Sequence, residues 1–272
     1  MDTTDRRRRI TVAVSAVIAI IGSFIGSGAV VGTPIAQAAG GALAADATLV
    51  APGTGAFQIW GIIYLGLVAY AVWQFLPGQR RAERHRRLGY PVALSLLLNA
   101  AWILSIQFGL LALSVPVIAA LLAVLVVAFL RAVRSTPTSA LDAVITDGTI
   151  GLYLGWVSVA TVANVTALLV ANGFDGFGIV GAAWGIALVA LAGIAGIALA
   201  IAGRGRIAPM LSLAWGLGWI AIARFSGDLV SVPVAVAAVV TTVVLVVVTL
   251  VIRLRSVRSP RSTASAGSAV RA

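Results

Sequence analysis

Residues 57–74 read FQIWGIIYLGLVAYAVWQ, and this stretch decides the fold class of the chain. It carries no charged side chain and is apolar enough to cross the hydrocarbon core of a bilayer as one α-helix. Phe57, Trp60 and Tyr64 are spaced so that their rings share one face of that helix. Trp73 lies at the opposite end, where an indole typically sits among the lipid headgroups. The stretch therefore predicts a transmembrane helix with one aromatic face.

The composition of the whole chain agrees with a membrane protein. The 272 residues are 61% hydrophobic and only 10% charged, whereas about a quarter of the residues in a soluble domain are charged. Cys is absent and the single His85 lies in an Arg-rich segment, which excludes disulfides, thiolate catalysis and a His-based metal cage. We predict an all-α integral membrane protein with about eight transmembrane helices. The predicted spans are residues 10–32, 57–76, 91–112, 116–134, 148–171, 178–202, 208–225 and 229–252.

Arg residues carry the whole positive charge, since the chain has no Lys and a net charge of +11. In a soluble protein this balance would suggest nucleic acid, but no soluble domain is left here to hold one. Eight crossings place every Arg except Arg224 on one side of the membrane, whereas the opposite loops carry Asp46, Asp175 and Asp228. By the positive-inside rule, both termini are expected in the cytoplasm, most simply at a bacterial plasma membrane.

The first span allows two interpretations. It follows a run of four Arg residues, as a secretory signal peptide does, and residues 36–38 resemble a cleavage site. The apolar stretch is longer than a typical signal core, and two small-xxx-small pairs suit it to packing against another helix. We therefore favour a retained helix. The pairs are Gly22 with Gly26 and Gly28 with Gly32.

Two later spans carry a Trp and an Asn at helical spacing. The third span contains Asn99 and Trp102, and the fifth contains Tyr153, Trp156 and Asn164. An unpaired amide inside hydrocarbon costs several kcal/mol, so each Asn must face protein or a wet cavity. Hydrogen bonding between helices and contact with a ligand both meet this requirement. The Trp residues likewise allow core packing as well as a pocket.

These motifs resemble the TspO/MBR family of tryptophan-rich sensory proteins, bacterial relatives of the mitochondrial translocator protein, over residues 10–172. The matching patterns are Ile59-Trp60-x-x-x-Tyr64, Leu96-x-Leu98-Asn99-x-x-Trp102 and Tyr153-x-x-Trp156-x-x-x-Ala160-x-x-x-Asn164. The resemblance implies that the first five helices form a TspO-like bundle, which binds porphyrins or other flat apolar ligands and, in animals, cholesterol. The predicted ligand-binding residues are Trp60, Tyr64, Asn99, Trp102, Tyr153, Trp156 and Asn164.

The chain also departs from this family pattern. The loop at residues 50–56 lacks the Trp that family members usually carry there, and three further apolar spans follow residue 172. We divide the chain into a basic cytoplasmic N-terminus, a five-helix TspO/MBR-like domain, three additional helices and a disordered cytoplasmic tail. The corresponding residues are 1–9, 10–172, 173–253 and 254–272.

The expected function is binding of a flat hydrophobic ligand, either a porphyrin, haem or other tetrapyrrole or a sterol-like molecule, for sensing or transport. No cofactor, metal or catalytic group is required, and no paired carboxylate or Ser/His/Asp set suggests an enzyme. The alternative is a secondary transporter of small apolar solutes that uses all eight helices. The expected partners are the lipid bilayer, a hydrophobic small molecule and a second copy of the chain in a homodimer, but no nucleic acid.

Overall fold

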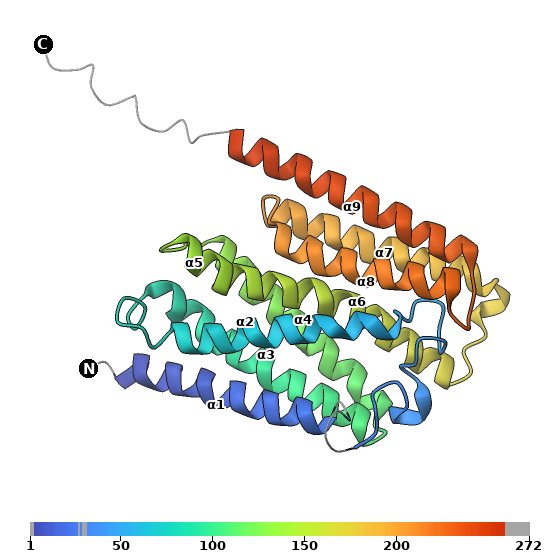
Figure 1. The fold of residues 1–272 in the computed structure, drawn as a ribbon, viewed down its shortest axis with the longest axis horizontal. Coiled ribbons are helices and arrows are strands. Elements are labelled where there is room, and N and C mark those ends of the chain that lie inside the picture. The colour runs from blue at the N-terminus through green and yellow to red at the C-terminus, as the bar shows by residue number, and fades with distance from the viewer. Residues whose placement is uncertain (1–2, 27, 29–31, 259–272) are drawn as a thin grey trace, which may run out of the picture.

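The computed structural model describes residues 3–26, 28 and 32–258, and every regular element in this part of the chain is a helix (Figure 1). Eight helical stretches there are long and apolar enough to cross a bilayer, as the sequence predicts. The helices are α1 (Thr3–Gly26), α2 (Ile59–Trp73), α3 (Glu83–Gln107), α4 (Leu111–Val133), the short α5 (Ala140–Asp142), α6 (Thr149–Ala171), α7 (Gly181–Ala202), α8 (Ile207–Ser226) and α9 (Val232–Arg258).

Shorter helical turns extend or connect these helices. The 3-10 turn η2 (Thr54–Gln58) leads directly into α2, and a π-helical turn, η3 (Ala143–Gly148), joins α5 to α6. Two further 3-10 turns, η1 (Ala38–Gly41) and η4 (Gly176–Gly178), lie in the loops that follow α1 and α6. The loop between α6 and α7 is therefore partly structured, and the loop before α2 contains two turns of its own.

The long helices run side by side and alternate in direction, so their connections gather at two ends of the molecule (Figure 1). The start of α1 and the end of α9 lie at the same end of the molecule, which we call the terminal end. The loops after α1, α3, α6 and α8 lie at the opposite, distal end. The Arg-bearing segments at 80–87, 131–134 and 204–206 belong to the terminal end, whereas Arg224 lies near the distal end. The even number of crossings therefore separates the charges as the sequence predicts.

The helices form two groups that meet along α6. The helices α1 to α4 and α6 share one apolar core, while α7, α8 and α9 surround a second core to which Val159 of α6 also contributes. The helices α6 and α8 approach closely because Gly151 and Gly155 face α8. A Cβ atom at position 155 would lie 2.2 Å from the carbonyl oxygen of Pro209. This is the small-xxx-small geometry that lets helix backbones meet in a membrane.

A similar close approach joins α1 to α3. A Cβ atom at Gly22 would lie 3.1 Å from Cβ of Ala100, and one at Gly26 would lie 2.7 Å from the side chain of Ile103. The first small-xxx-small pair therefore packs helices, as expected. The second pair does not, because Gly28 and Gly32 follow the end of α1 and adopt φ values of +70° and +100°.

Several helix ends differ from the apolar boundaries in the sequence. The turn between α3 and α4 lies at residues 108–110 rather than between residues 112 and 116, because α4 already begins at Leu111. The helix α3 begins at Glu83, well before residue 91, and α9 continues to Arg258. Residues 254–258, which the sequence assigns to the tail, are therefore helical. Residues 259–272 lie outside the described part of the chain.

The early start of α3 follows from buried charges at the terminal end. Arg84 forms an ion pair with Asp147 of η3 and lies 3.7 Å from Asp142, and Arg206 contacts Asp147 at 2.6 Å. His85 is fully buried and contacts the side chain of Gln79 at 3.0 Å. Asp142 and Asp147 therefore connect the start of α3 to η3 and to the start of α8.

Candidate functional site

The aromatic residues singled out in the sequence meet in one cluster around Trp60. The Trp60 ring of α2 stacks on Tyr64, with ring centres 5.3 Å apart, and on Trp102 of α3 at 6.4 Å. It meets Tyr153 and Trp156 of α6 edge to face, at 5.8 Å and 6.3 Å. Trp102, Tyr153 and Trp156 are buried, whereas Trp60 and Tyr64 are half-buried. Three helices thus supply one aromatic cluster that reaches the surface along α2.

Asn99 holds the α2 side of this cluster. Its amide nitrogen donates to the hydroxyl oxygen of Tyr64 at 2.6 Å, and the same hydroxyl shares a short hydrogen bond with Ser23 of α1. The amide oxygen of Asn99 is buried and has no hydrogen-bond partner among the described residues. Asn99 therefore joins α3 to α2 and still offers a free acceptor.

Both the oxygen and the nitrogen of the Asn164 amide form hydrogen bonds. Its oxygen accepts from the indole nitrogen of Trp102 at 2.9 Å, and its nitrogen donates to Ser114 of α4 at 2.8 Å. Asn164 thereby links α6 to α3 and α4. Of the two interpretations left open for the Asn residues, this geometry favours a helix-to-helix link for Asn164. Asn99 combines such a link with an unused polar atom.

Trp156 provides the second unused polar atom of the cluster. Its indole nitrogen is buried and has no acceptor among the described residues, whereas Tyr153 donates its hydroxyl to the carbonyl oxygen of Ser95 at 3.2 Å. Phe57, in the turn η2 that leads into α2, packs edge to face on Trp156 at 5.9 Å. The cluster therefore contains one free buried donor, at Trp156, and one free buried acceptor, at Asn99.

Little empty space remains beside the cluster. A cavity of about 30 Å³ is bounded by Phe57, Trp102, Trp156 and Asn164 and is covered by residues of the loop between α1 and α2. This volume holds about one or two water molecules. The structure thus brings all seven predicted site residues to one region between α2, α3 and α6, but with their own rings filling it.

The helix α8 holds the loop that covers this cavity, which the sequence did not suggest. The indole nitrogen of Trp215 donates to the carbonyl oxygen of Ala56 at 2.9 Å, and Trp219 packs against Gly53 and Gly55. Gly53 donates its backbone N–H to the carbonyl oxygen of Trp219 at 3.2 Å. Trp215 and Trp219 look like a simple packing stripe in the sequence, and their loop contacts appear only in the fold.

Arg224 of α8 binds the same loop. Its guanidinium donates to the carbonyl oxygen of Thr48 at 3.0 Å and, through a short hydrogen bond, to that of Ala45. The sequence suggests an ion pair between Arg224 and Asp228, one helical turn apart, but Asp228 is exposed while Arg224 is buried. The carbonyl groups of the loop therefore take the place of the expected carboxylate partner.

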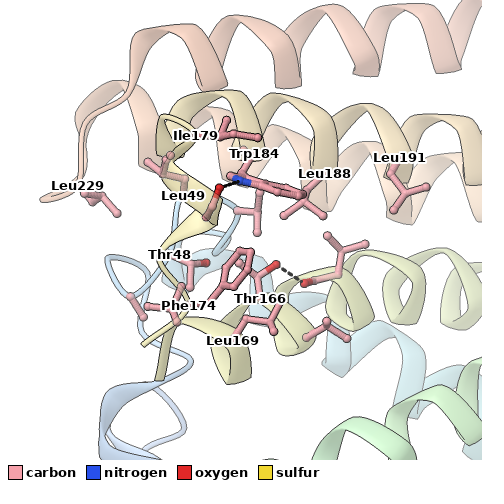
Figure 2. Close-up of a pocket in the computed structure, with 18 of the residues that line it drawn as sticks. Thr48, Leu49, Thr166, Leu169, Phe174, Ile179, Trp184, Leu188, Leu191 and Leu229 are labelled. Carbon is pink, nitrogen blue, oxygen red and sulfur yellow. Dashed lines mark hydrogen bonds between the residues drawn. The ribbon is translucent and has the colours of Figure 1, made fainter. Parts of the chain in front are cut away.

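A much larger cavity lies between α6 and α7, outside the predicted site. Its volume is about 580 Å³, and its walls are almost entirely apolar. Figure 2 shows Phe174 and Trp184 close together, with Thr166 and Leu169 on one wall of the cavity and Leu188 and Leu191 on the other. The only signal in the sequence is a pair of aromatic residues at the distal ends of these spans. That signal does not distinguish a cavity from the usual interfacial aromatic belt.

Comparison with known proteins identifies the family. The model of the family described as TSPO-like protein matches residues 13–251, which include all eight predicted spans in whole or in large part. No curated protein and no solved structure matches the chain. The family match reaches further than the motifs at residues 10–172, because it also includes α7 and α8 and most of α9. This integral membrane protein therefore belongs to the TSPO-like family.

Proposed function

We propose that this TSPO-like protein binds a flat hydrophobic ligand, such as a porphyrin or another tetrapyrrole or a sterol-like molecule, at the aromatic cluster around Trp60. Its family suggests a membrane sensory or ligand-binding protein. The observation that carries the proposal is the combination of stacked indole rings with two unpaired buried polar atoms. These atoms are the indole nitrogen of Trp156 and the amide oxygen of Asn99. A flat ligand with polar edges can stack on the rings and pair with both atoms.

Binding at this site requires the covering loop to move. The present cavity of about 30 Å³ is far smaller than the several hundred Å³ of a typical ligand pocket. Phe57 and the loop residues Leu43 and Pro52 border the cavity, so their displacement would open it towards the distal end. The half-buried rings of Trp60 and Tyr64 give a second approach, from the lipid along α2. The loop therefore acts as the lid of the proposed site.

The proposed role is binding, sensing or transfer rather than catalysis. The cluster residues provide stacking faces, one donor and one acceptor, but no carboxylate or imidazole that could transfer a proton during a reaction. Haem or protoporphyrin enters this proposal as a ligand and not as a cofactor that the protein needs in order to act. The bilayer is the medium from which such an apolar molecule would reach the cluster.

A ligand titration tests the proposal. We expect protoporphyrin to quench the intrinsic Trp emission of the purified protein in a saturable way, with half-saturation in the micromolar range. The double variant Trp102→Phe with Trp156→Phe should lose most of this saturable component. Trp73→Phe, at the opposite end of α2, removes a Trp without touching the cluster and serves as the control. Quenching that rises linearly and is equal in all three proteins would mean partition into the detergent micelle and would refute the site.

A second candidate function is transport of small apolar solutes through all eight helices. The cavity of about 580 Å³ favours it, because α6 of the first group of helices and α7 of the second form its opposite walls. Flux measurements on proteoliposomes distinguish the two functions. Saturable binding without flux supports sensing, whereas flux driven by a solute gradient and abolished by filling this cavity supports transport.

A further inference from the structure

The cavity between α6 and α7 has the dimensions of a ligand site. Its volume of about 580 Å³ lies within the range of pockets that enclose drug-sized molecules. The residues around it come from α6, α7, η4 and the loop at 47–50, so several separate segments enclose it. Phe174 and Trp184 meet edge to face at 5.8 Å at its distal end, and Leu191 lies further along α7 (Figure 2).

The mouth of this cavity faces the lipid. Val165 and Leu169 of α6 and Leu191 of α7 line the cavity and are also exposed on the protein surface. In a helix that crosses the bilayer, an exposed apolar side chain contacts acyl chains. A molecule dissolved in the bilayer can therefore enter sideways between the two helices, without passing through water.

The polar groups around the cavity leave one hydroxyl without a partner. Thr161 and Thr166 donate to carbonyl oxygens of their own helix at 2.7 Å and 2.8 Å, and the indole nitrogen of Trp184 donates to Gly176 at 3.0 Å. The hydroxyl of Thr48 is different, because this residue is only 5% exposed and its oxygen has no hydrogen-bond partner among the described residues. Thr48 therefore offers an unused hydrogen bond at the cavity.

The backbone holds Thr48 in place while its side chain stays free. The buried guanidinium of Arg224 donates to the carbonyl oxygen of Thr48, so the residue is fixed beside the cavity by α8. In Figure 2 the hydroxyl of Thr48 points towards the side where Phe174 and Trp184 lie, and Leu191 lies at the other end of the cavity. The unpaired polar atom thus lies at the distal end, and the apolar side chains of Leu188 and Leu191 extend along α7 towards the membrane centre.

The charges around the cavity exclude an anionic head group. Among the described residues that line it, Asp175 is the one ionisable side chain, and no basic residue accompanies it. A carboxylate or phosphate would be placed near a like charge in a largely apolar environment, which is unfavourable. A neutral head that can both donate and accept a hydrogen bond fits the Thr48 hydroxyl better.

We propose that this cavity binds a neutral, single-headed amphiphile of the long-chain alcohol class. The hydroxyl head pairs with Thr48 at the distal end, and the chain lies between α6 and α7 past Leu188 and Leu191. This orientation matches that of a lipid in the adjoining leaflet, whose polar head also lies at the membrane surface. None of the seven residues of the aromatic cluster lines this cavity, although Thr48 also borders the small cavity beside the cluster.

Photolabelling of the full-length protein in lipid vesicles tests the proposal. Three probes carry the same diazirine-bearing chain and end in a hydroxyl, a carboxylate or a methyl group. We expect the alcohol to label peptides within residues 161–191 most strongly, in a saturable way that unlabelled long-chain alcohol competes away. Labelling that is equal for the three probes, or spread evenly over the lipid-facing helices, would overturn the proposal.

Two substitutions test where the hydroxyl head and the alkyl chain of the bound alcohol lie. Thr48→Val keeps the shape but removes the hydroxyl, and it should lower alcohol labelling about two- to tenfold, the effect of one neutral hydrogen bond, without changing methyl-probe labelling. Leu188→Trp fills the cavity and should abolish labelling by both probes, whereas Leu65→Trp on the exposed face of α2 should change neither. If the Thr48→Val variant keeps the same ratio of labelling by the alcohol probe to labelling by the methyl probe, the head group does not pair with Thr48. This result does not depend on whether Leu188→Trp folds.

The two proposed sites can fail independently. The Trp102→Phe, Trp156→Phe double variant should keep normal alcohol labelling, because neither ring lines the cavity between α6 and α7. Loss of porphyrin quenching together with retained alcohol labelling would separate the aromatic site from this one. Loss of alcohol labelling in a folded double variant would show that the probe binds at the cluster and would refute a separate site.

Discussion

Asn164 and Asn99 differ in how completely the surrounding helices satisfy their amides. Both are buried amides in apolar spans, and the sequence gives no reason to separate them. In the fold, Asn164 accepts from Trp102 and donates to Ser114, while Asn99 uses only its nitrogen, towards Tyr64. The first residue therefore contributes mainly to stability. The second retains an acceptor that a ligand can use.

This difference predicts unequal effects of Asn→Leu substitution on stability. Asn164→Leu leaves the indole N–H of Trp102 without its acceptor inside hydrocarbon, and we expect the free energy of unfolding to fall by about 1–2 kcal/mol. Asn99→Leu removes one bond, but the Tyr64 hydroxyl keeps its contact with Ser23, so a loss of about 0.5–1 kcal/mol is expected. Unfolding of both variants in detergent measures the difference. An equal or larger loss for Asn99→Leu would contradict this assignment.

At the scale of elements, α8 connects the second group of helices to the proposed ligand site. It packs closely on α6 at Gly151 and Gly155, and it also binds the loop between α1 and α2 through Trp215, Trp219 and Arg224. The loop has few hydrogen bonds of its own over residues 42–56. Its position over the aromatic cluster therefore depends on a helix that lies far away in the sequence.

Removing the contact of Arg224 should loosen this loop. Arg224→Met keeps a long apolar stem but loses the hydrogen bonds to the carbonyl oxygens of Thr48 and Ala45. We expect amide hydrogen exchange over residues 42–56 to become about tenfold faster or more, because a charge-assisted hydrogen bond contributes about 1.5–3 kcal/mol. Exchange in α6 should stay unchanged. Hydrogen exchange read by mass spectrometry measures both segments.

The matched control for this experiment is Arg134→Met. Arg134 is exposed at the terminal end, so the same change of side chain there should leave exchange in the loop as it is in the unsubstituted protein. If Arg224→Met also leaves the loop unchanged, then Trp215 and Trp219 alone hold it. If both substitutions accelerate exchange throughout the chain, the effect is general destabilisation and the proposed role of Arg224 is wrong.

At the scale of the whole molecule, the even number of spans brings both ends of the described chain to one side (Figure 1). The Arg-rich connections lie at this terminal end, and the distal loops carry Asp46 and Asp228. Basic loops are retained on the cytoplasmic side of a membrane. The charge distribution therefore predicts that the terminal end faces the cytoplasm.

Single Cys substitutions test this orientation, since the chain has no Cys of its own. Two substitutions, Asp46→Cys and Asp228→Cys, place the thiol at exposed positions of the distal end. Two others, Arg81→Cys and Arg134→Cys, place it at exposed positions of the terminal end. We expect an impermeant thiol reagent to label the two distal variants on intact cells, and the terminal variants only after the cells are permeabilised. The reverse pattern would show that the molecule is inserted the other way round.

The sequence by itself determined the number of membrane-spanning helices and indicated which residues form the aromatic cluster. Hydrocarbon leaves no partner for backbone N–H and C=O groups, so each long uncharged run must be a helix, whatever surrounds it. Trp60, Trp102 and Trp156 were predicted to meet because aromatic and amide side chains at helical spacing define a face. A polar face in a membrane must pack against protein or line a cavity. These inferences depend only on local patterns.

Only the tertiary structure decided the helix ends, the hydrogen-bond partners and the empty space. The helix α3 begins as early as Glu83 because Arg84 forms ion pairs with Asp142 and Asp147, which lie far away in the sequence. Thr48, Arg224 and the cavity between α6 and α7 acquire their roles from contacts between three separate segments. Lipid is as apolar as a Leu side chain, so hydropathy cannot say which helix faces meet and which leave a gap. That choice depends on the shapes of the packed side chains.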